Sequence, residues 1–147
     1  MIDGDFHLSD FLCFAIYSAG HALNRIYKPM LDALGLTYPQ YLVLSVLWQE
    51  DGQTVGDIGD RLFLDSSTLS PLLKRMESMG YLRRERDRAD ERVVHVRLTE
   101  QGQALRDAAR DLPNCIIQAS GKSADDLRQM KVEIENLRDA FNRSGRR

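Results

Sequence analysis

Two cysteines, Cys13 and Cys115, carry the most easily oxidised side chains of the chain. Cys13 stands near the start of a helical pattern, where the helix dipole favours the thiolate, which is the reactive form of a thiol. Most free cysteines, however, are small buried hydrophobes without a chemical role. From these residues alone a packing residue is the favoured interpretation of Cys13, and a reactive thiol is the alternative.

A second group of side chains is suited to contact with nucleic acid. Small, mostly hydroxyl-bearing residues and two cations gather on one face or at the N-terminal end of a helix predicted over 67–79: Ser66, Ser67, Thr68, Ser70, Pro71, Lys74 and Arg75. Such side chains fit against base edges and phosphates without steric conflict. The other face is apolar and points inward: Leu69, Leu72, Leu73 and Met76. The segment therefore has the composition of a DNA recognition helix.

A charged turn, residues 87–92, follows this helix between two strand-like runs, 81–86 and 93–98. A hairpin tip so charged is usually only solvated. Directly after a helix-turn-helix it is better interpreted as a wing, whose arginine enters the narrow and strongly negative minor groove while neighbouring acids hold its side chain. The hairpin adds these predicted DNA-binding residues: Arg84, Arg86, Arg88, Asp90 and Arg92.

The elements that must position these residues follow from periodicity and caps. Thr54 is a good N-cap for a helix over 55–63, and Gly80 is a good C-terminal stop for the recognition helix. An apolar stripe gives the first helix its core face: Val55, Ile58, Leu62 and Phe63. Residues 54–98 thus have the layout of a winged helix-turn-helix.

Long helical patterns flank this module. The first covers residues 8–34 with Ser9 and Asp10 as caps, and Pro29 should bend or split it; a helix over 39–49 follows. Beyond the wing we predict a helix over 100–118, kinked at Pro113, and a last helix over 124–142. Its stripe has the spacing that requires a partner helix: Leu127, Met130, Ile134, Leu137 and Phe141. Pairing of 8–34 and 100–142 with the same helices of a second copy predicts a homodimer.

Composition sets the remaining bounds. The chain has 147 residues, 43% of them hydrophobic, and a net charge of −2, so it is not globally basic. Residues 65–98 carry eight Lys/Arg and six Asp/Glu, a local balance of +2. We expect one mainly α domain over 1–147, no membrane span, and a cytoplasmic protein with reduced thiols. His7, His21 and His95 have no ligand spacing, so we expect neither a metal site nor a cofactor.

At this level of detail the chain resembles the MarR family of dimeric repressors. The run LDSSTLSPLLKRMESMGYLRRERDRADERVVHVRLTEQG carries the resemblance, and helices at both ends extend it over nearly the whole chain. The segments LCFAIYSAGHALNRIYKPML and LTYPQYLVLSVLW are similar to the organic-hydroperoxide-sensing OhrR-type subgroup. The resemblance implies that Asp90 pairs with Arg92, that Cys13 is the sensing thiol, and that Tyr27 and Tyr38 hydrogen-bond it.

The spacing of these residues constrains where such a site could form. Cys13 and Tyr27 are 14 positions apart, which in one straight helix is about 21 Å. Either Pro29 and its neighbours fold the chain back, or the contact is made across a dimer, which is our prediction. A phenol beside a thiolate favours the charged form, and apolar neighbours of Cys13 favour peroxides with alkyl tails over hydrogen peroxide.

The resemblance also implies a role for Cys115. Some members of the subgroup form an intersubunit disulfide between the sensing cysteine and a cysteine in this part of the chain; the alternative is that Cys115 only packs and a small thiol reacts with Cys13. The expected function is therefore a repressor whose reduced dimer binds a palindromic double-stranded DNA operator and whose oxidation by organic hydroperoxides releases it.

Two other functions stay open. One is a MarR-type repressor released by a reversibly bound phenolic ligand, for which an aromatic set could line a pocket, although a core or dimer stripe is its commoner use: Phe6, Phe11, Phe14, Tyr17 and Tyr41. The other is a thiol peroxidase, against which the absence of a thioredoxin-like βαβ pattern around Cys13 argues. We therefore predict that the chain is not an enzyme.

Overall fold

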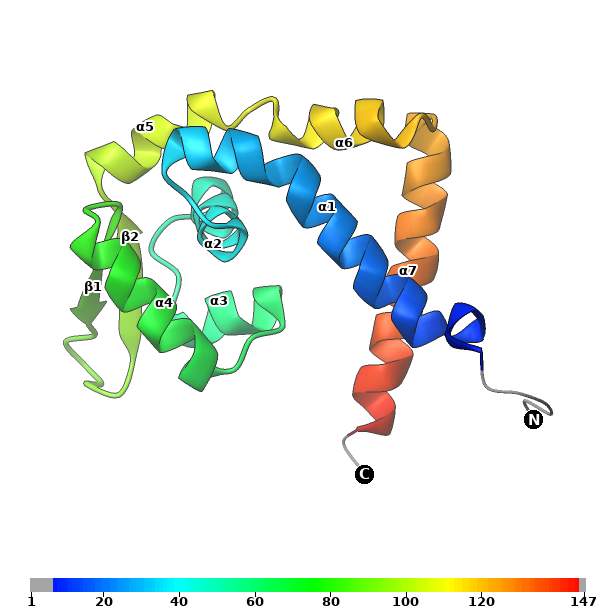
Figure 1. The fold of residues 1–147 in the computed structure, drawn as a ribbon. Helices are drawn as coiled ribbons and strands as arrows, with labels where there is room; N and C mark the ends of the chain where they lie inside the picture. Colours follow the sequence, from blue (N-terminus) through cyan, green and yellow to red (C-terminus); the bar gives the residue numbers. More distant parts are fainter. Residues whose placement is uncertain (1–6, 146–147) are drawn as a thin grey trace. The chain divides into compact units, whose positions relative to one another are not determined.

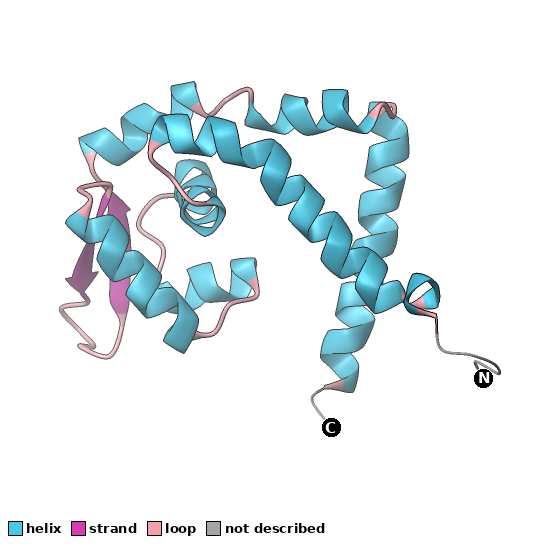
Figure 2. Cartoon of the chain, viewed as in Figure 1, coloured by secondary structure: helices cyan, strands magenta, loops and turns pink. Residues whose placement is uncertain are grey.

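The computed structural model describes residues 7–145 and is mostly helical with one two-stranded hairpin (Figures 1 and 2). In chain order the elements are η1 (Leu8–Asp10), α1 (Leu12–Leu34), α2 (Tyr38–Gln49), α3 (Val55–Leu62), α4 (Ser66–Ser78), β1 (Leu82–Arg86), β2 (Val94–Leu98), α5 (Glu100–Ala108), α6 (Leu112–Ser120) and α7 (Ala124–Ser144). The predicted fold class is confirmed. The chain divides into two compact units, one that ends at Arg110 and one that begins at Asp111.

The first long helix differs from its prediction in two ways. The predicted start, with Ser9 and Asp10 as caps, is wrong: these residues form the short 3-10 turn η1, and α1 begins only after Phe11. Pro29 does not split α1, which continues to Leu34. Pro29 is exposed, so water can hydrogen-bond to the carbonyl that its missing N–H frees. Gly35, at φ 68°, ends the helix in the left-handed conformation.

The second helix, α2, is the centre of the first unit. A capping box starts it, in which Thr37 and Gln40 bond each other's backbone N–H. Both of its faces are buried, including Val43 and Leu44, because α1, α3, α4, α5 and β2 all pack around it. In the described residues no single helix is long and apolar enough to cross a membrane; α1 and α2 pass that test only as a pair, bent by 72°.

The winged helix-turn-helix forms around caps that the sequence predicts. Thr54 accepts the Asp57 amide at 3.1 Å at the start of α3, and Asp65 accepts the Thr68 amide at 2.9 Å at the start of α4. One predicted core residue is misplaced: Phe63 lies outside α3 at φ 56° and is 57% exposed. Its left-handed turn ends α3 and directs the chain into α4, so its ring leaves the apolar stripe.

The wing is an antiparallel pair in which Leu82 lies opposite Leu98 and Glu85 opposite His95. Leu82 and Val96 are buried, and together with Leu69, Leu73 and Met76 of α4 they form the core beneath the wing. A bridge between Thr54 and His95 adds the turn before α3 to the edge of β2. The recognition helix and the wing thus share one core.

The C-terminal region has one more break than the pattern predicts. The helix expected over 100–118 is two helices, α5 and α6, because Pro113 stands in the first turn of α6 and starts it instead of kinking a continuous helix. Ser123 caps α7 by accepting the Asp126 amide at 3.1 Å. Within one protomer the α7 side chains of Met130, Ile134 and Phe141 are 42–55% exposed.

Candidate nucleic-acid interface and thiol site

The two faces of α4 separate as the sequence predicts. Leu69, Leu73 and Met76 are fully buried, and Leu72, also predicted to face inward, is half-buried. All seven predicted contact residues are exposed: Ser66, Ser67, Thr68, Ser70, Pro71, Lys74 and Arg75. The Ser67 hydroxyl donates to Asp65 at 2.8 Å, and this bond with the Thr68 amide bond lowers the pKa of the Asp65 carboxyl. The polar face is therefore free to meet a ligand.

The wing tip holds one arginine outward. Arg92 donates to both carboxylate oxygens of Asp90, each at 3.1 Å, and its backbone N–H donates to the same carboxylate. These bonds lower the pKa of Asp90, with the Arg92 side-chain bond as the largest cause. The Arg92 side chain is still 91% exposed. Asp90 thus limits the directions that the guanidinium can take without shielding it from a ligand.

The other wing arginines differ from Arg92 in their exposure and in their hydrogen-bond partners. Arg84 is half-buried and donates its Nε and Nη2 to Glu77 of α4, at 3.3 and 3.0 Å. Its backbone N–H donates to the same carboxylate, and these bonds lower the pKa of Glu77. Arg86 donates to the carbonyl of Glu91 at 2.9 Å, and Arg88 is exposed in the loop. Sequence reasoning missed Glu77, whose partner lies seven residues away across the end of the helix.

A cleft of about 420 Å³ lies between α4 and the wing, the two parts predicted to contact DNA. Ser70 of α4 and Arg92 of the wing both line it, beside the first turn of α3. The complete lining is Thr54, Val55, Gly56, Ser70, Leu73, Arg84, Arg92, Val93 and Val94. The α4 helix and the wing therefore border the same cleft, as the predicted contact with two adjacent grooves would require.

Besides the contact of Arg84 with Glu77, the sequence did not reveal the hydrogen bonds of the His95 ring. Its Nε2 lies 2.8 Å from Asp87 Oδ2 and its Nδ1 lies 3.2 Å from the carbonyl oxygen of Gly52. The Asp87 bond is the largest cause of a raised pKa of His95, and the same bond lowers the pKa of Asp87.

Across residues 7–145, no three His, Cys, Asp or Glu side chains are grouped so that they could hold a metal ion.

The two thiols are free in the structure. Cys13 is the second residue of α1 and is exposed, so within its own protomer it is not a core packing residue. Its neighbours Phe14 and Ile16 are 40% and 44% exposed, which leaves an apolar surface around the thiol. Cys115 lies in α6, partly exposed, with its Sγ 3.6 Å from the carbonyl oxygen of Asp111.

The two tyrosines assigned to the thiol by resemblance lie together. The rings of Tyr27 and Tyr38 stack with centroids 5.1 Å apart, although the first belongs to α1 and the second opens α2. Tyr41 adjoins both, at 6.3 and 6.2 Å. We call Tyr27, Tyr38 and Tyr41 the tyrosine cluster. Burial, and secondarily Tyr41, raises the pKa of Tyr38, so its hydroxyl keeps its proton and can donate it in a hydrogen bond.

The thiol and the tyrosine cluster are apart within one chain. Cys13 and Tyr27 belong to the same uninterrupted helix, so about 21 Å of helix axis separates them. The alternative in which Pro29 folds the chain back is therefore wrong. A contact between a Cys13 thiol and Tyr27 needs the thiol of a second chain.

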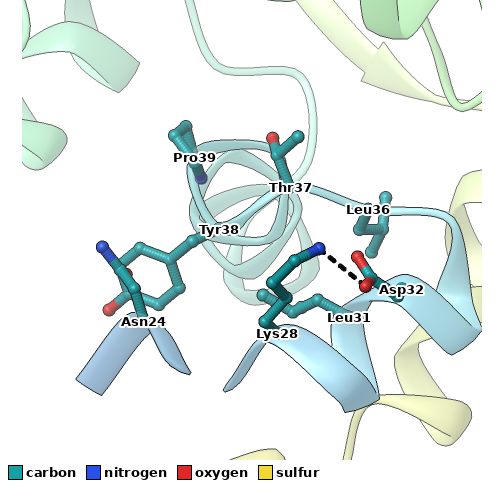
Figure 3. A pocket seen from close by; sticks show the side chains of 8 residues that line it. All are labelled: Asn24, Lys28, Leu31, Asp32, Leu36, Thr37, Tyr38 and Pro39. Atoms are coloured by element: carbon teal, nitrogen blue, oxygen red, sulfur yellow. Dashed lines mark hydrogen bonds and ion pairs between the residues drawn. The ribbon is translucent and has the colours of Figure 1, made fainter. Parts of the chain in front are cut away.

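A pocket of about 370 Å³ opens beside the tyrosine cluster, between α1 and the start of α2. Figure 3 shows Asn24 next to the Tyr38 ring, and Lys28 paired with Asp32 at 2.8 Å on the opposite side. The lining is Asn24, Lys28, Leu31, Asp32, Leu36, Thr37, Tyr38 and Pro39. Among the aromatic residues considered for a phenolic ligand, Phe6 lies outside the described residues. The other four do not line this pocket: Phe11, Phe14, Tyr17 and Tyr41.

Similarities to known proteins agree with this geometry. A family model described as transcriptional regulator SarA/Rot matches residues 25–109. The transcriptional regulator TtmR of Methylorubrum extorquens is 49% identical over 128 residues, which are 87% of this chain but only 66% of that longer protein. The organic hydroperoxide resistance transcriptional regulator of Bacillus subtilis is 45% identical over 130 residues, 88% of each chain.

One regulator of similar fold has been solved in several states. Reduced AbfR bound to DNA has a TM-score of 0.77 and 36% identity, over 91% of this chain and 94% of that one. A disulfide-formed AbfR has a TM-score of 0.63 and 35% identity, over 88% and 91%. AbfR comes from Staphylococcus epidermidis.

Proposed function

Because the chain belongs to the MarR/SarA class of winged-helix transcriptional regulators, we propose that it is a dimeric repressor released from DNA when an organic hydroperoxide oxidises Cys13. One observation carries the proposal. Cys13 is exposed at one end of α1, and Tyr27, whose ring stacks on Tyr38 of α2, lies about 21 Å along the same helix. Two chains are therefore needed to complete one thiol site.

DNA contact follows from the exposed face of α4 and the wing. The hydroxyls and cations of α4 would meet base edges and phosphates in a major groove, while Arg92 enters the adjacent minor groove. A twofold dimer would place two such modules on a palindromic operator, with half-site centres about 34 Å apart. Reduced AbfR has been solved on DNA, which supports the same use of this module.

Dimerisation would use the apolar surface that each protomer leaves open. On α1 these side chains are 40–66% exposed: Leu12, Phe14, Ile16, Tyr17, Leu23 and Ile26. On α7 the exposed set is Met130, Val132, Ile134 and Phe141. So many exposed apolar side chains are rarely left in water, and pairing of each helix with helices of a second copy would bury them.

The chemistry at Cys13 would take two steps. The thiolate attacks the terminal, hydroxyl-bearing oxygen of the peroxide and the O–O bond breaks. The alkoxide leaves and takes a proton from water to become an alcohol, and Cys13 becomes a sulfenic acid. The thiolate of Cys115 in the other subunit then attacks that sulfur and releases water, so that a disulfide forms. Bridged Cα atoms lie within about 7 Å, so closing the bond would pull on α1 and α6 and change the spacing of the recognition helices.

A binding titration tests the proposal. The reduced protein first selects a duplex from a random-sequence pool, and fluorescence anisotropy then follows its release by cumene hydroperoxide. We expect full release of the wild type and retention of Cys13→Ser. Equal release of the Cys13→Ser variant would rule out the thiol mechanism. Peroxide consumption should stop at about one equivalent per subunit; continued turnover would indicate a thiol peroxidase instead.

The pocket beside Tyr38 favours a second candidate, a repressor released by a reversibly bound phenolic ligand. Its volume of about 370 Å³ suits a single aromatic ring with polar substituents, which Lys28 and Asn24 could bond. The two candidates separate cleanly. A phenolic acid added under reducing conditions would release wild type and Cys13→Ser equally if this second function holds, and neither if it does not.

A further inference from the structure

We infer that His95 is a positioning residue for DNA binding, whose ring fastens the base of the wing loop to the turn before α3. The inference rests on the proposed function in one respect, that the wing contacts DNA. Among residues 7–145, His95 belongs to no group that could hold a metal ion. Its role follows from the two atoms that its ring meets.

Both partners of the His95 ring can only accept hydrogen bonds. Nε2 faces a carboxylate oxygen of Asp87 at 2.8 Å, and Nδ1 faces the carbonyl oxygen of Gly52 at 3.2 Å. A neutral imidazole carries one N–H, so it can satisfy only one of these acceptors. The imidazolium carries two and satisfies both. The geometry therefore selects the doubly protonated ring.

On the wing side, Asp87 connects His95 to the backbone of the wing loop. Its Oδ1 accepts the backbone N–H groups of Ala89 at 2.8 Å and Asp90 at 3.2 Å, while its Oδ2 faces His95. Asp90 in turn holds the Arg92 side chain. A continuous series of hydrogen bonds therefore joins His95 to the arginine proposed to enter the minor groove.

On the other side, His95 reaches the segment that starts α3. Gly52 stands two residues before Thr54, which caps α3 and bridges to His95. Two further bonds fasten the same turn to β2: the Val96 amide donates to Gln53 O at 2.8 Å, and the Leu98 amide donates to Asp51 Oδ1 at 2.9 Å. The ring is the part of this attachment that can titrate within the physiological pH range.

The charges around the ring favour its protonated form. Asp87 raises the pKa of His95 above its ordinary value of 6.5, and Arg97 on the same strand lowers it by a smaller amount. Glu85 lies opposite His95 in the sheet, but its carboxylate is bonded to Arg97 at 3.1 Å. Asp51, from the turn before α3, accepts the backbone N–H groups of Gly52 and Leu98 at its Oδ1.

The direction of the pH effect follows. The raised pKa of His95 means that its contribution is complete below about pH 6.5 and is lost as pH rises through the raised value. The lowered pKa of Asp87 means that its contribution is present above about pH 3.9 and is lost only as pH falls through the lowered value. The wing should therefore be fastened in mild acid and loosen as pH rises through the raised pKa of His95.

DNA affinity measured from pH 6 to 9 tests the role of His95, with the duplex selected by the reduced protein as the probe. His95→Gln cannot titrate, so its profile should lack the wild-type loss of affinity in base. Between pH 6 and 9 we expect the DNA affinity of the wild type to fall by about threefold to tenfold relative to that of His95→Gln. The double variant His7→Gln/His21→Gln, which removes the other two histidines, should keep the wild-type profile. Parallel profiles for wild type and His95→Gln would overturn the inference.

NMR of the free protein gives a measurement that needs no DNA. The His95 ring should titrate above 6.5 in the wild type and closer to 6.5 in Asp87→Asn, and the backbone of residues 88–92 should become more mobile as it deprotonates. A titration at or below 6.5, or an unchanged loop, would contradict the attachment. If the reduced protein selects no duplex, the proposed function fails, while this titration still decides whether His95 fastens the wing.

Discussion

Glu77 of the recognition helix α4 accepts three hydrogen bonds from Arg84 of the wing strand β1. The Arg84 backbone N–H lies at 2.7 Å, its Nε at 3.3 Å and its Nη2 at 3.0 Å. Because one carboxylate holds both the backbone and the side chain of Arg84, the angle between helix and strand is restricted. Arg84, predicted from sequence as a DNA contact, therefore also braces the two elements that we propose contact DNA.

Replacing Glu77 with Gln should weaken this brace. The amide keeps an acceptor but loses the charge, and both side chains are about one-third exposed, so we expect stability to fall by only about 1 kcal/mol. DNA affinity should fall by about tenfold, with a smaller ratio of specific to non-specific binding. Anisotropy with the selected duplex and a scrambled one measures this. Glu50→Gln, whose nearest cation is 3.9 Å away, is the matched control; equal effects of the two variants would contradict the brace.

Arg92→Ala should remove the minor-groove contact. We expect a loss of affinity of about fivefold to 100-fold, and a salt dependence reduced by about one ion, because one cation leaves the DNA surface. The loss should be largest for duplexes with A·T-rich sequence under the wing, where the minor groove is narrow. Arg110→Ala, which removes an exposed arginine paired with Asp107 at 2.7 Å, serves as control. Identical losses on A·T-rich and G·C-rich flanks would argue against minor-groove entry.

Tyr27→Phe and Tyr38→Phe should leave reduced DNA binding intact and slow oxidation. Each removes one phenol able to donate to the Cys13 thiolate of a partner, and one bond to a charged group corresponds to about a tenfold lower rate. Stopped-flow oxidation by cumene hydroperoxide measures the rate constant. Tyr17→Phe, whose ring packs against His21 at 4.4 Å, should oxidise at the wild-type rate. Unchanged rates in both cluster variants would remove the tyrosines from the mechanism.

Cys115→Ser should abolish the peroxide-induced covalent dimer. On a non-reducing gel the oxidised wild type should run as a dimer and the variant as a monomer that carries oxidised Cys13, identified by mass. Release from DNA should become slower or incomplete in the variant. A wild-type monomer with oxidised Cys13 would instead show that Cys115 has no part and that a small thiol resolves the sulfenic acid.

Gly102→Ala should destabilise the first unit. Gly102 is buried, and a Cβ there would collide with the Tyr81 backbone carbonyl, while its own carbonyl accepts Trp48 Nε1 at 3.0 Å. Since backbone cannot yield as a side chain can, we expect a loss of about 3 kcal/mol in urea unfolding at fixed protein concentration. Gly56→Ala in α3 meets only Thr54 Oγ1 at 3.8 Å and should be neutral or stabilising by up to about 1 kcal/mol. Equal stability of the two variants would contradict the collision.

Local rules predicted most elements correctly and failed where a turn competed with a helix. Thr54 caps α3 and Gly80, at φ 82°, follows the end of α4 as expected, because a cap depends on residues three or four positions away. Phe63 was predicted in the core because its position continues the helical period, but the left-handed turn there takes its ring out. Pro113 follows a turn at residues 109–111 and begins α6, whereas Pro29 lies inside the continuous helix α1. The helical period of the apolar residues does not distinguish these two placements.

By itself the sequence determined the type of each surface: a hydroxyl-rich, basic face on the recognition helix, a charged wing tip with Asp90 two residues before Arg92, and a cysteine near the start of an apolar helix. These features are local, so spacing and chemistry suffice to find them. Only the tertiary structure decided which distant groups meet. It stacks Tyr27 on Tyr38, brings His95 to Gly52 across 43 positions, and keeps α1 continuous, so that Cys13 and Tyr27 remain far apart within one chain. Such contacts depend on how helices pack around α2, and no short pattern in the chain specifies that packing.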